Sequence, residues 1–128
     1  MAKQPTPGAK ILLAEDDKSL SSVLMNKPIR RGYQVVLAKD GAEAVKKAVS
    51  EQPQLILLDI IMPIKNGFEA LEEIKKNPAT KKINMVVMSN LGQDSDIAKA
   101  KQLGAKDYLI KSNFAINDIV EKTKKYLT

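Results

Sequence analysis

Short apolar runs alternate along the chain with longer segments in which apolar residues recur at helical spacing. The runs predict five strands, at residues 11–14, 33–37, 55–58, 85–88 and 108–110. The segments between them predict five helices, at about residues 18–31, 42–51, 67–76, 95–103 and 115–127. Strict alternation of strands this apolar with helices predicts a parallel sheet between two helical layers, a three-layer α/β/α sandwich.

Residues that end or begin helices support this reading. Gly32 and Gly104 stand where helices are expected to end, and Asp40 and Asp94 stand where side chains are expected to cap the following helix. Pro28 conflicts with its place inside the first helical segment, because it removes a backbone hydrogen bond and costs about 3 kcal/mol in a regular helix interior. A kink or an early helix end is therefore expected at Pro28.

The length of 128 residues fits a single domain. Residues 1–9, with two prolines and a glycine, are expected to form a flexible N-terminal arm, and residues 10–128 the folded domain. No segment is apolar enough to span a bilayer or to act as a secretory signal, so a cytoplasmic location is expected. The net charge of +6 comes from lysines spread along the chain, which favours a solvated surface over direct DNA binding or a membrane surface.

The amino-acid composition narrows the chemistry. The chain has no cysteine and no histidine. Disulfides, thiolate and imidazole metal ligands, cysteine nucleophiles and serine–histidine triads are therefore excluded, as is a role as a phosphohistidine donor. Any reaction must use carboxylates, hydroxyls, lysines and backbone groups.

Polar residues follow four of the five predicted strands. Right-handed crossovers bring the carboxyl ends of parallel strands to one edge of the sheet, where ligands bind in this class of fold. The groups expected to meet at that edge are Glu15-Asp16-Asp17, Asp59, Ser89 and Lys111. Clustered carboxylates repel one another unless a cation lies among them, and an all-oxygen set of ligands suits Mg²⁺.

Among carboxylate reactions, nucleophilic attack on phosphorus fits this set best. By this hypothesis Asp59 is the nucleophile, Asp16 and Glu15 hold the metal ion, Lys111 balances the phosphoryl charge, and Ser89 donates a hydrogen bond to the phosphoryl group. Simpler interpretations stay open. Glu15 and Asp16 could be acids that do no more than stabilise the N-terminus of a helix. The Ser89 hydroxyl could hydrogen-bond to its own backbone, and Lys111 could be a solvated surface lysine.

Four segments of the chain form an ordered set of motifs. They are Ile11-Leu12-Leu13-Ala14-Glu15-Asp16-Asp17, Leu57-Leu58-Asp59 leading to Met62-Pro63 and Asn66-Gly67, Val86-Val87-Met88-Ser89, and Asp107-Tyr108-Leu109-Ile110-Lys111. With these segments the chain resembles the receiver domain of two-component response regulators, and it is close in layout to the single-domain chemotaxis type. The resemblance covers residues 10–127.

The resemblance implies a flavodoxin-like sheet with strand order 2-1-3-4-5 and a role for each matching residue. The phosphoacceptor is implied at Asp59, direct ligation of Mg²⁺ at Asp16, ligation through water at Glu15 and ligation by the backbone carbonyl at Ile61. The family's switch hydroxyl is implied at Ser89, its lysine at Lys111, and the aromatic whose inward or outward rotamer reports activation at Tyr108.

The resemblance also implies partners. A histidine kinase or a histidine phosphotransfer protein would supply the phosphoryl group, and a downstream protein effector would bind the face made by the fourth helix, the fifth strand and the fifth helix. That face would include Lys99, Lys106, Tyr108 and Lys122. The protein would catalyse its own phosphorylation and slow autodephosphorylation without being a turnover enzyme, as a monomer or a weak phosphorylation-dependent dimer.

The sequence departs from the family pattern at two places. Ser112 follows Lys111 where the family usually has a proline in a cis peptide, and a trans link is expected because a non-proline cis bond costs roughly 2.5 to 4 kcal/mol. Asn90 follows Ser89 where a small residue is common. These departures leave open a phosphorylation-independent protein-binding module. A phosphate-ester hydrolase would need a second acid beside Asp59, and Ile61, two residues on, cannot act as one.

Overall fold

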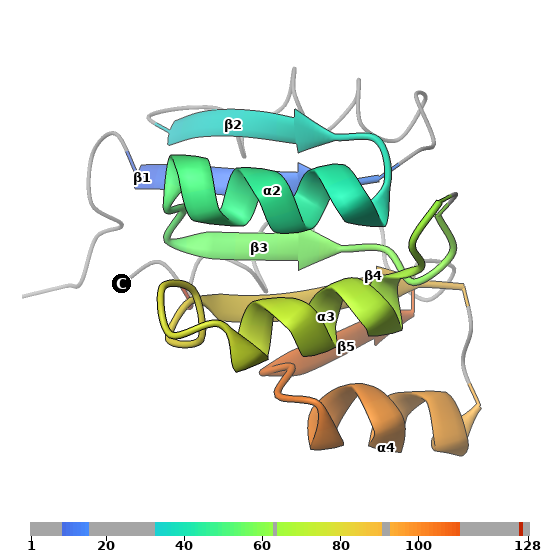
Figure 1. The fold of residues 1–128 in the computed structure, drawn as a ribbon. Coiled ribbons are helices and arrows are strands. Elements are labelled where there is room, and N and C mark those ends of the chain that lie inside the picture. The colour runs from blue at the N-terminus through green and yellow to red at the C-terminus, as the bar shows by residue number, and fades with distance from the viewer. Residues whose placement is uncertain (1–8, 16–32, 63, 91–92, 111–125, 127–128) are drawn as a thin grey trace, which may run out of the picture.

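A computed structural model describes residues 9–15, 33–62, 64–90, 93–110 and 126. Within them, five parallel strands form a single sheet in the order β2-β1-β3-β4-β5. The strands are β1 (Ala9–Ala14), β2 (Tyr33–Ala38), β3 (Leu55–Leu58), β4 (Asn84–Ser89) and β5 (Asp107–Ile110) (Figure 1). The order implied by the family resemblance is confirmed.

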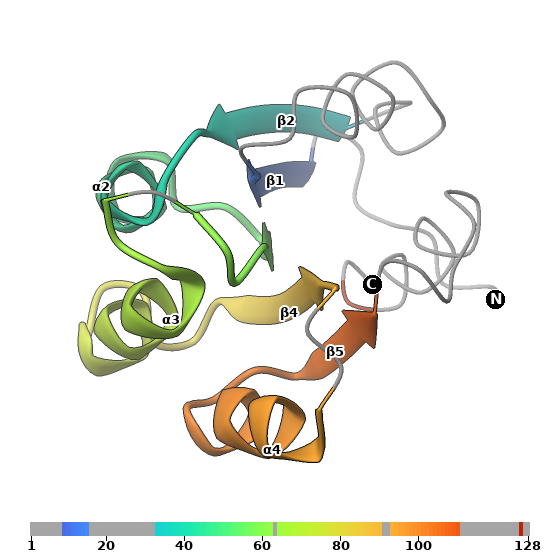
Figure 2. The same cartoon turned by 90° about the vertical axis from the view of Figure 1, so that its right-hand side faces the viewer.

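Among the described residues, three helices lie along one face of this sheet. They are α2 (Gly41–Glu51), α3 (Gly67–Lys76) and α4 (Asp94–Gln102), and Figure 2 shows them side by side against the strands. The described strands and helices agree with the sequence prediction to within two residues at each end. The predicted helix at 18–31, with Pro28, lies outside the described residues, as does the predicted arm up to residue 8. The predicted helix at 115–127 also lies outside them, apart from Tyr126.

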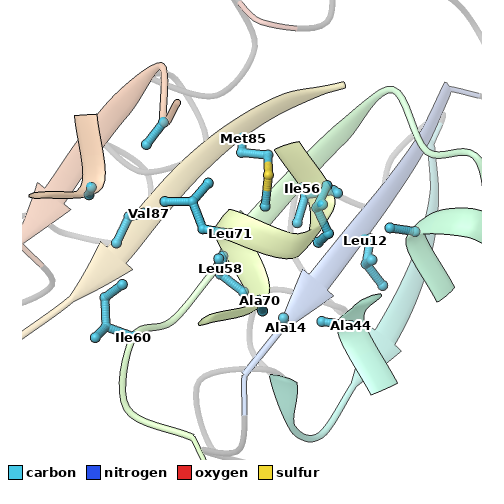
Figure 3. Close-up of a cluster of buried hydrophobic side chains, with 14 of the residues drawn as sticks. Leu12, Ala14, Ala44, Ile56, Leu58, Ile60, Ala70, Leu71, Met85 and Val87 are labelled. Carbon is cyan, nitrogen blue, oxygen red and sulfur yellow. The ribbon is translucent and has the colours of Figure 1, made fainter. Parts of the chain in front are cut away.

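Successive residues of each strand bury their side chains on opposite faces of the sheet. Leu12, Ile56 and Met85 belong to the cluster beneath α2, α3 and α4, which Figure 3 shows around Leu71 of α3. The other face holds a second cluster, which includes Leu13 and Leu57. Both clusters are almost fully buried, with exposures of 0–1% for these strand residues. Burying one such side chain stabilises the fold by about 1.5–3 kcal/mol. The prediction of a sheet covered on both faces is confirmed.

Local contacts at the helix ends explain where the helices begin and end. The Asp40 side chain accepts a hydrogen bond from the Glu43 amide at 2.8 Å, which confirms the predicted cap of α2. Gly104 follows α4 with φ +113°, a conformation that favours glycine. The predicted cap at Asp94 is wrong. The Gln93 carbonyl closes the first turn, so α4 begins at Asp94, and this carboxylate instead lies near the positive end of the helix dipole.

Tyr126 forms hydrogen bonds with the first residues of β4 and β5. Its hydroxyl donates to Asp107 Oδ2 at 2.9 Å, and Asn84 Nδ2 donates to its carbonyl at 3.3 Å. Burial, the hydrogen bond to Asp107 and that residue's negative charge raise the pKa of Tyr126 to about 12. No helix among the described residues is long and apolar enough to cross a membrane.

Replacing Tyr126 by Phe should lower the free energy of unfolding at neutral pH by about 1 kcal/mol, because Asp107 Oδ2 loses the hydroxyl that donates to it. The ordinary tyrosine pKa is about 10, so the folded-state pKa is raised. The contribution of the hydroxyl is therefore fully present below the ordinary pKa and is lost as the pH rises towards the folded-state value of about 12. Urea unfolding of both proteins across this range measures the difference. Equal stability at neutral pH would contradict the prediction.

Candidate functional site

Two acidic residues follow the ends of the neighbouring strands β1 and β3. Ala14 pairs with Leu58, the Asp59 amide donates to the Ala14 carbonyl at 2.9 Å, and the Glu15 amide donates to Ala38 at 3.0 Å. Both acidic residues are buried, with exposures of 4% for Glu15 and 5% for Asp59. Carboxylates so far from water need compensating charge or hydrogen bonds. Their placement at the carboxyl edge is the one predicted from the sequence.

The chain after Asp59 folds back onto its carboxylate. The Ile61 amide donates to Asp59 Oδ1 at 3.2 Å, so the main chain of Ile61 lies beside the acid. The Gly67 amide then donates to the Ile60 carbonyl at 2.8 Å. A Cβ atom at Gly67 would lie 2.3 Å from the Asp59 carbonyl oxygen. The absence of a side chain at Gly67 therefore allows the loop to close against Asp59.

The far side of this loop is held just as closely. A Cβ atom at Gly41, the first residue of α2, would lie 1.9 Å from the Lys65 carbonyl oxygen. The Asn66 side chain accepts from the Glu69 amide at 3.0 Å, and the Glu69 carboxylate accepts from the Asn66 amide in return. Lys65 also forms an ion pair with Glu73. These contacts hold the end of the loop from β3 to α3 against the start of α2.

Ser89 and Tyr108 lie on the same face of neighbouring strands. Tyr108 pairs with Val87 and Ser89 with Ile110, so the two polar side chains are diagonal neighbours. Ser89 is 0% exposed and Tyr108 is 8% exposed, so both side chains are buried. Tyr108 therefore occupies an inward position beneath the helical layer.

Burial raises the pKa of Tyr108 above its ordinary value, and the hydrogen bond from Ser89 opposes this shift. The negative charges of Asp96 and Asp59 raise the pKa further. The charge of Asp59 therefore acts on Tyr108 across the edge of the sheet. The roles predicted for Asp59, Ser89 and Tyr108 stay predictions.

Several predicted site residues lie outside the described residues, so their roles stay predictions. They are Asp16, Asp17, Lys111, Ser112 and Lys122. Among the described residues, no three acidic side chains gather to hold a metal ion. The predicted set includes Asp16, and its described members are Glu15, Asp59 and the carbonyl of Ile61. Asn90, next to the buried Ser89, is exposed.

The structure adds residues that the sequence analysis missed. Gly41 is needed as a glycine because the Lys65 backbone packs against it. The only signal for this in the sequence was a glycine directly after a predicted capping Asp. Asp96 contributes charge at Tyr108. Lys99, predicted on the output face, lies with its ammonium 4.5 Å from the centre of the Phe68 ring. It therefore occupies the seam between α3 and α4.

The sequence of the chain matches a family model over most of its length. Residues 11–124 match the model described as the response regulator receiver domain. The chain belongs to this family. Receiver domains of response regulators are phosphoacceptors, so the family and the carboxyl-edge acids agree.

Two relatives and one solved structure illustrate the similarity. The receiver is 34% identical over 103 residues to protein PilH from Pseudomonas aeruginosa, covering 80% of this chain and 85% of that protein. It is 34% identical over 119 residues to the chemotaxis protein CheY from Bacillus subtilis, covering 92% and 97%. Its fold matches the receiver domain of the sensor histidine kinase PA1611 from P. aeruginosa, with a TM-score of 0.83, 27% identity and coverage of 94% and 98%. That domain was solved with a magnesium ion coordinated in the active site cleft.

Replacing Gly67 by Ala should disturb the site directly, because the new methyl group would meet the Asp59 backbone. We expect the free energy of unfolding to fall by about 1–3 kcal/mol. We also expect the amide NMR signals of Asp59 and Ile61 to move. Gly104→Ala is the matched control, because its φ of +113° costs stability at the opposite end of the sheet. If Gly104→Ala moved the Asp59 and Ile61 signals as far, or if Gly67→Ala left them in place, the positional role of Gly67 would be refuted.

Proposed function

We propose that Asp59 accepts a phosphoryl group from the phosphohistidine of a sensor kinase or of a histidine phosphotransfer protein, with Mg²⁺ as cofactor. One observation carries the proposal. The buried Asp59 carboxylate ends a core strand beside Glu15, and the loop that follows folds back to donate a hydrogen bond to it. Burying a carboxylate costs desolvation free energy, and a buried acid at the carboxyl edge of an α/β sheet is typical of a reactive site.

The residues present fit a magnesium ion by their chemistry. The carboxylates of Glu15 and Asp59 and the carbonyl of Ile61 are hard oxygen ligands, and the predicted contribution of Asp16 is of the same kind. Mg²⁺ usually takes one or two protein carboxylates and keeps several waters. When bound, it would neutralise the charge of the phosphoryl oxygens.

In the transfer step, a carboxylate oxygen of Asp59 attacks phosphorus. A new oxygen–phosphorus bond forms as the nitrogen–phosphorus bond of the phosphohistidine breaks, and the bonding pair leaves with the donor's nitrogen. The Ile61 amide holds Asp59 Oδ1 and so orients the carboxylate for this attack. Lys111 is proposed as the counter-charge for the phosphoryl oxygens.

The hydroxyl of Ser89 is proposed to turn towards the new phosphoryl group. Ser89 lies on the same face of the sheet as Tyr108 and influences the pKa of its hydroxyl, so the change at Asp59 would reach the face formed by α4, β5 and the predicted fifth helix. A phosphoryl group that binds one arrangement of this pair better than the other shifts the population between them. The output proposed is contact with a protein effector. The alternative of a phosphorylation-independent binding module has no observation in its favour among the described residues.

Incubation with acetyl phosphate and Mg²⁺ should add the mass of one phosphoryl group to the parent, as measured by intact-protein mass spectrometry. Asp59→Asn should stay unlabelled, because an amide oxygen is a far weaker nucleophile than a carboxylate. Asp40→Asn is the matched control, because asparagine also caps helices and Asp40 lies outside the proposed site. Full labelling of Asp59→Asn, or labelling without Mg²⁺ at the same rate, would refute the proposal.

A further inference from the structure

Two large apolar side chains are exposed on the loop that follows Asp59. The exposed large apolar residues of the described chain are Val49, Ile61 and Ile64, at 43%, 57% and 83%. Ile61 and Ile64 stand on the loop from β3 to α3, which projects beyond the carboxyl edge of the sheet in Figure 1. Exposed apolar side chains on a loop next to a reactive edge are candidates for a contact surface, and the conformation of Ile64 singles it out.

Ile64 has an unfavourable backbone conformation for an isoleucine, which suggests that its side chain is there for a purpose other than folding. Ile64 has a φ of +69°, in the left-handed region that β-branched residues rarely adopt. Its side chain is 83% exposed, so packing within the receiver does not compensate for this conformation. A glycine or an asparagine would fit the same backbone better. The isoleucine therefore costs the folded chain stability and gives it little burial in return.

The loop presents this side chain on a fixed backbone. Gly67 packs on the Asp59 carbonyl, Gly41 packs on the Lys65 carbonyl, and the Asn66 and Glu69 pair closes the start of α3. A contact residue held in place before binding loses little conformational entropy when a partner covers it. Ile64 is thus preorganised for contact.

The accessibility of Asp59 indicates what covers the loop. Asp59 is only 5% exposed, so a donor's phosphorus must enter the carboxyl edge to reach bonding distance of the carboxylate. A protein that carries this phosphorus on a side chain must then lie over the loop that flanks Asp59. We propose that Ile64, together with Ile61 on the same loop, is the apolar contact for the protein phosphodonor, and that the donor has an apolar surface next to its phosphohistidine. The inference rests on the proposed role of Asp59 and names the surface through which its donor docks.

The test compares a protein donor with a small one. A panel of isolated ³²P-labelled histidine phosphotransfer domains is screened against the parent, and the fastest donor is kept as the probe. For Ile64→Asn we expect kcat/KM for transfer from this domain to fall by about tenfold or more. Labelling by acetyl phosphate should stay at the parent rate, because a small donor makes no contact with the side chain. The Tm of Ile64→Asn should rise by about 2–6 °C as the backbone strain is relieved.

Two further variants make the result specific. Ile64→Leu keeps an apolar side chain and should retain most of the transfer rate, whereas Val49→Asn removes an exposed apolar residue near the far end of α2 and should change nothing. Unchanged transfer to Ile64→Asn, an equal loss in Val49→Asn, or a parallel loss with acetyl phosphate would overturn the inference. So would a panel in which no domain transfers to a parent that acetyl phosphate labels. Loss of self-association with unchanged transfer would assign the surface to a second copy of the chain. A parent that acetyl phosphate does not label would instead refute the proposed role of Asp59.

Discussion

The register between β1 and β3 is the constraint on which the site depends. Ala14 opposite Leu58 brings the residues that follow them, Glu15 and Asp59, to neighbouring positions at the edge of the sheet. A shift of one residue would turn the side chains of a strand to the opposite faces and would draw a carboxylate towards the apolar layer. The two fully buried clusters that fill both faces of these strands therefore position the acids as well as stabilise the fold.

The same sheet connects the reactive edge to its surroundings. The loop after β3 returns to Asp59 through the Ile61 amide and continues into α3 at a glycine pressed against the Asp59 backbone. On the other side, β4 and β5 place Ser89 and Tyr108 on one face, within electrostatic reach of Asp59. Phosphorylation of Asp59, as proposed, would therefore add charge between a loop held by backbone contacts and the side chains of Ser89 and Tyr108. These two side chains are the ones proposed to change position.

The sequence predicted the strand ends well because apolar runs and crossover handedness decide them, and these are local or universal properties. Asp59 could be singled out because four core residues precede it. Three interactions could not be predicted, since each depends on the register and packing of segments distant in sequence. They are the influence of Ser89 on Tyr108, the hydrogen bond from Tyr126 to Asp107, and the packing of the Lys65 backbone against Gly41. The start of α4 was misplaced because the Gln93 backbone, which carries no sequence signature, closes its first turn.

The backbone of Ile64 shows a different limit. Its left-handed φ follows from the closure of a loop held at both ends. An isoleucine in the sequence gives no sign of such a conformation. Local preference and observed conformation disagree at Ile64, and such disagreements are expected where a protein meets its partners.

The most direct test of the site is a crystal structure grown with Mg²⁺ and beryllofluoride, which imitates a phosphoryl group. We expect beryllium bonded to a carboxylate oxygen of Asp59, with Mg²⁺ beside Glu15 and the carbonyl of Ile61. A structure in which Asp59 stays unmodified at saturating beryllofluoride, or in which the metal ion binds away from Glu15 and Ile61, would contradict the assignment of this edge as a phosphoacceptor site.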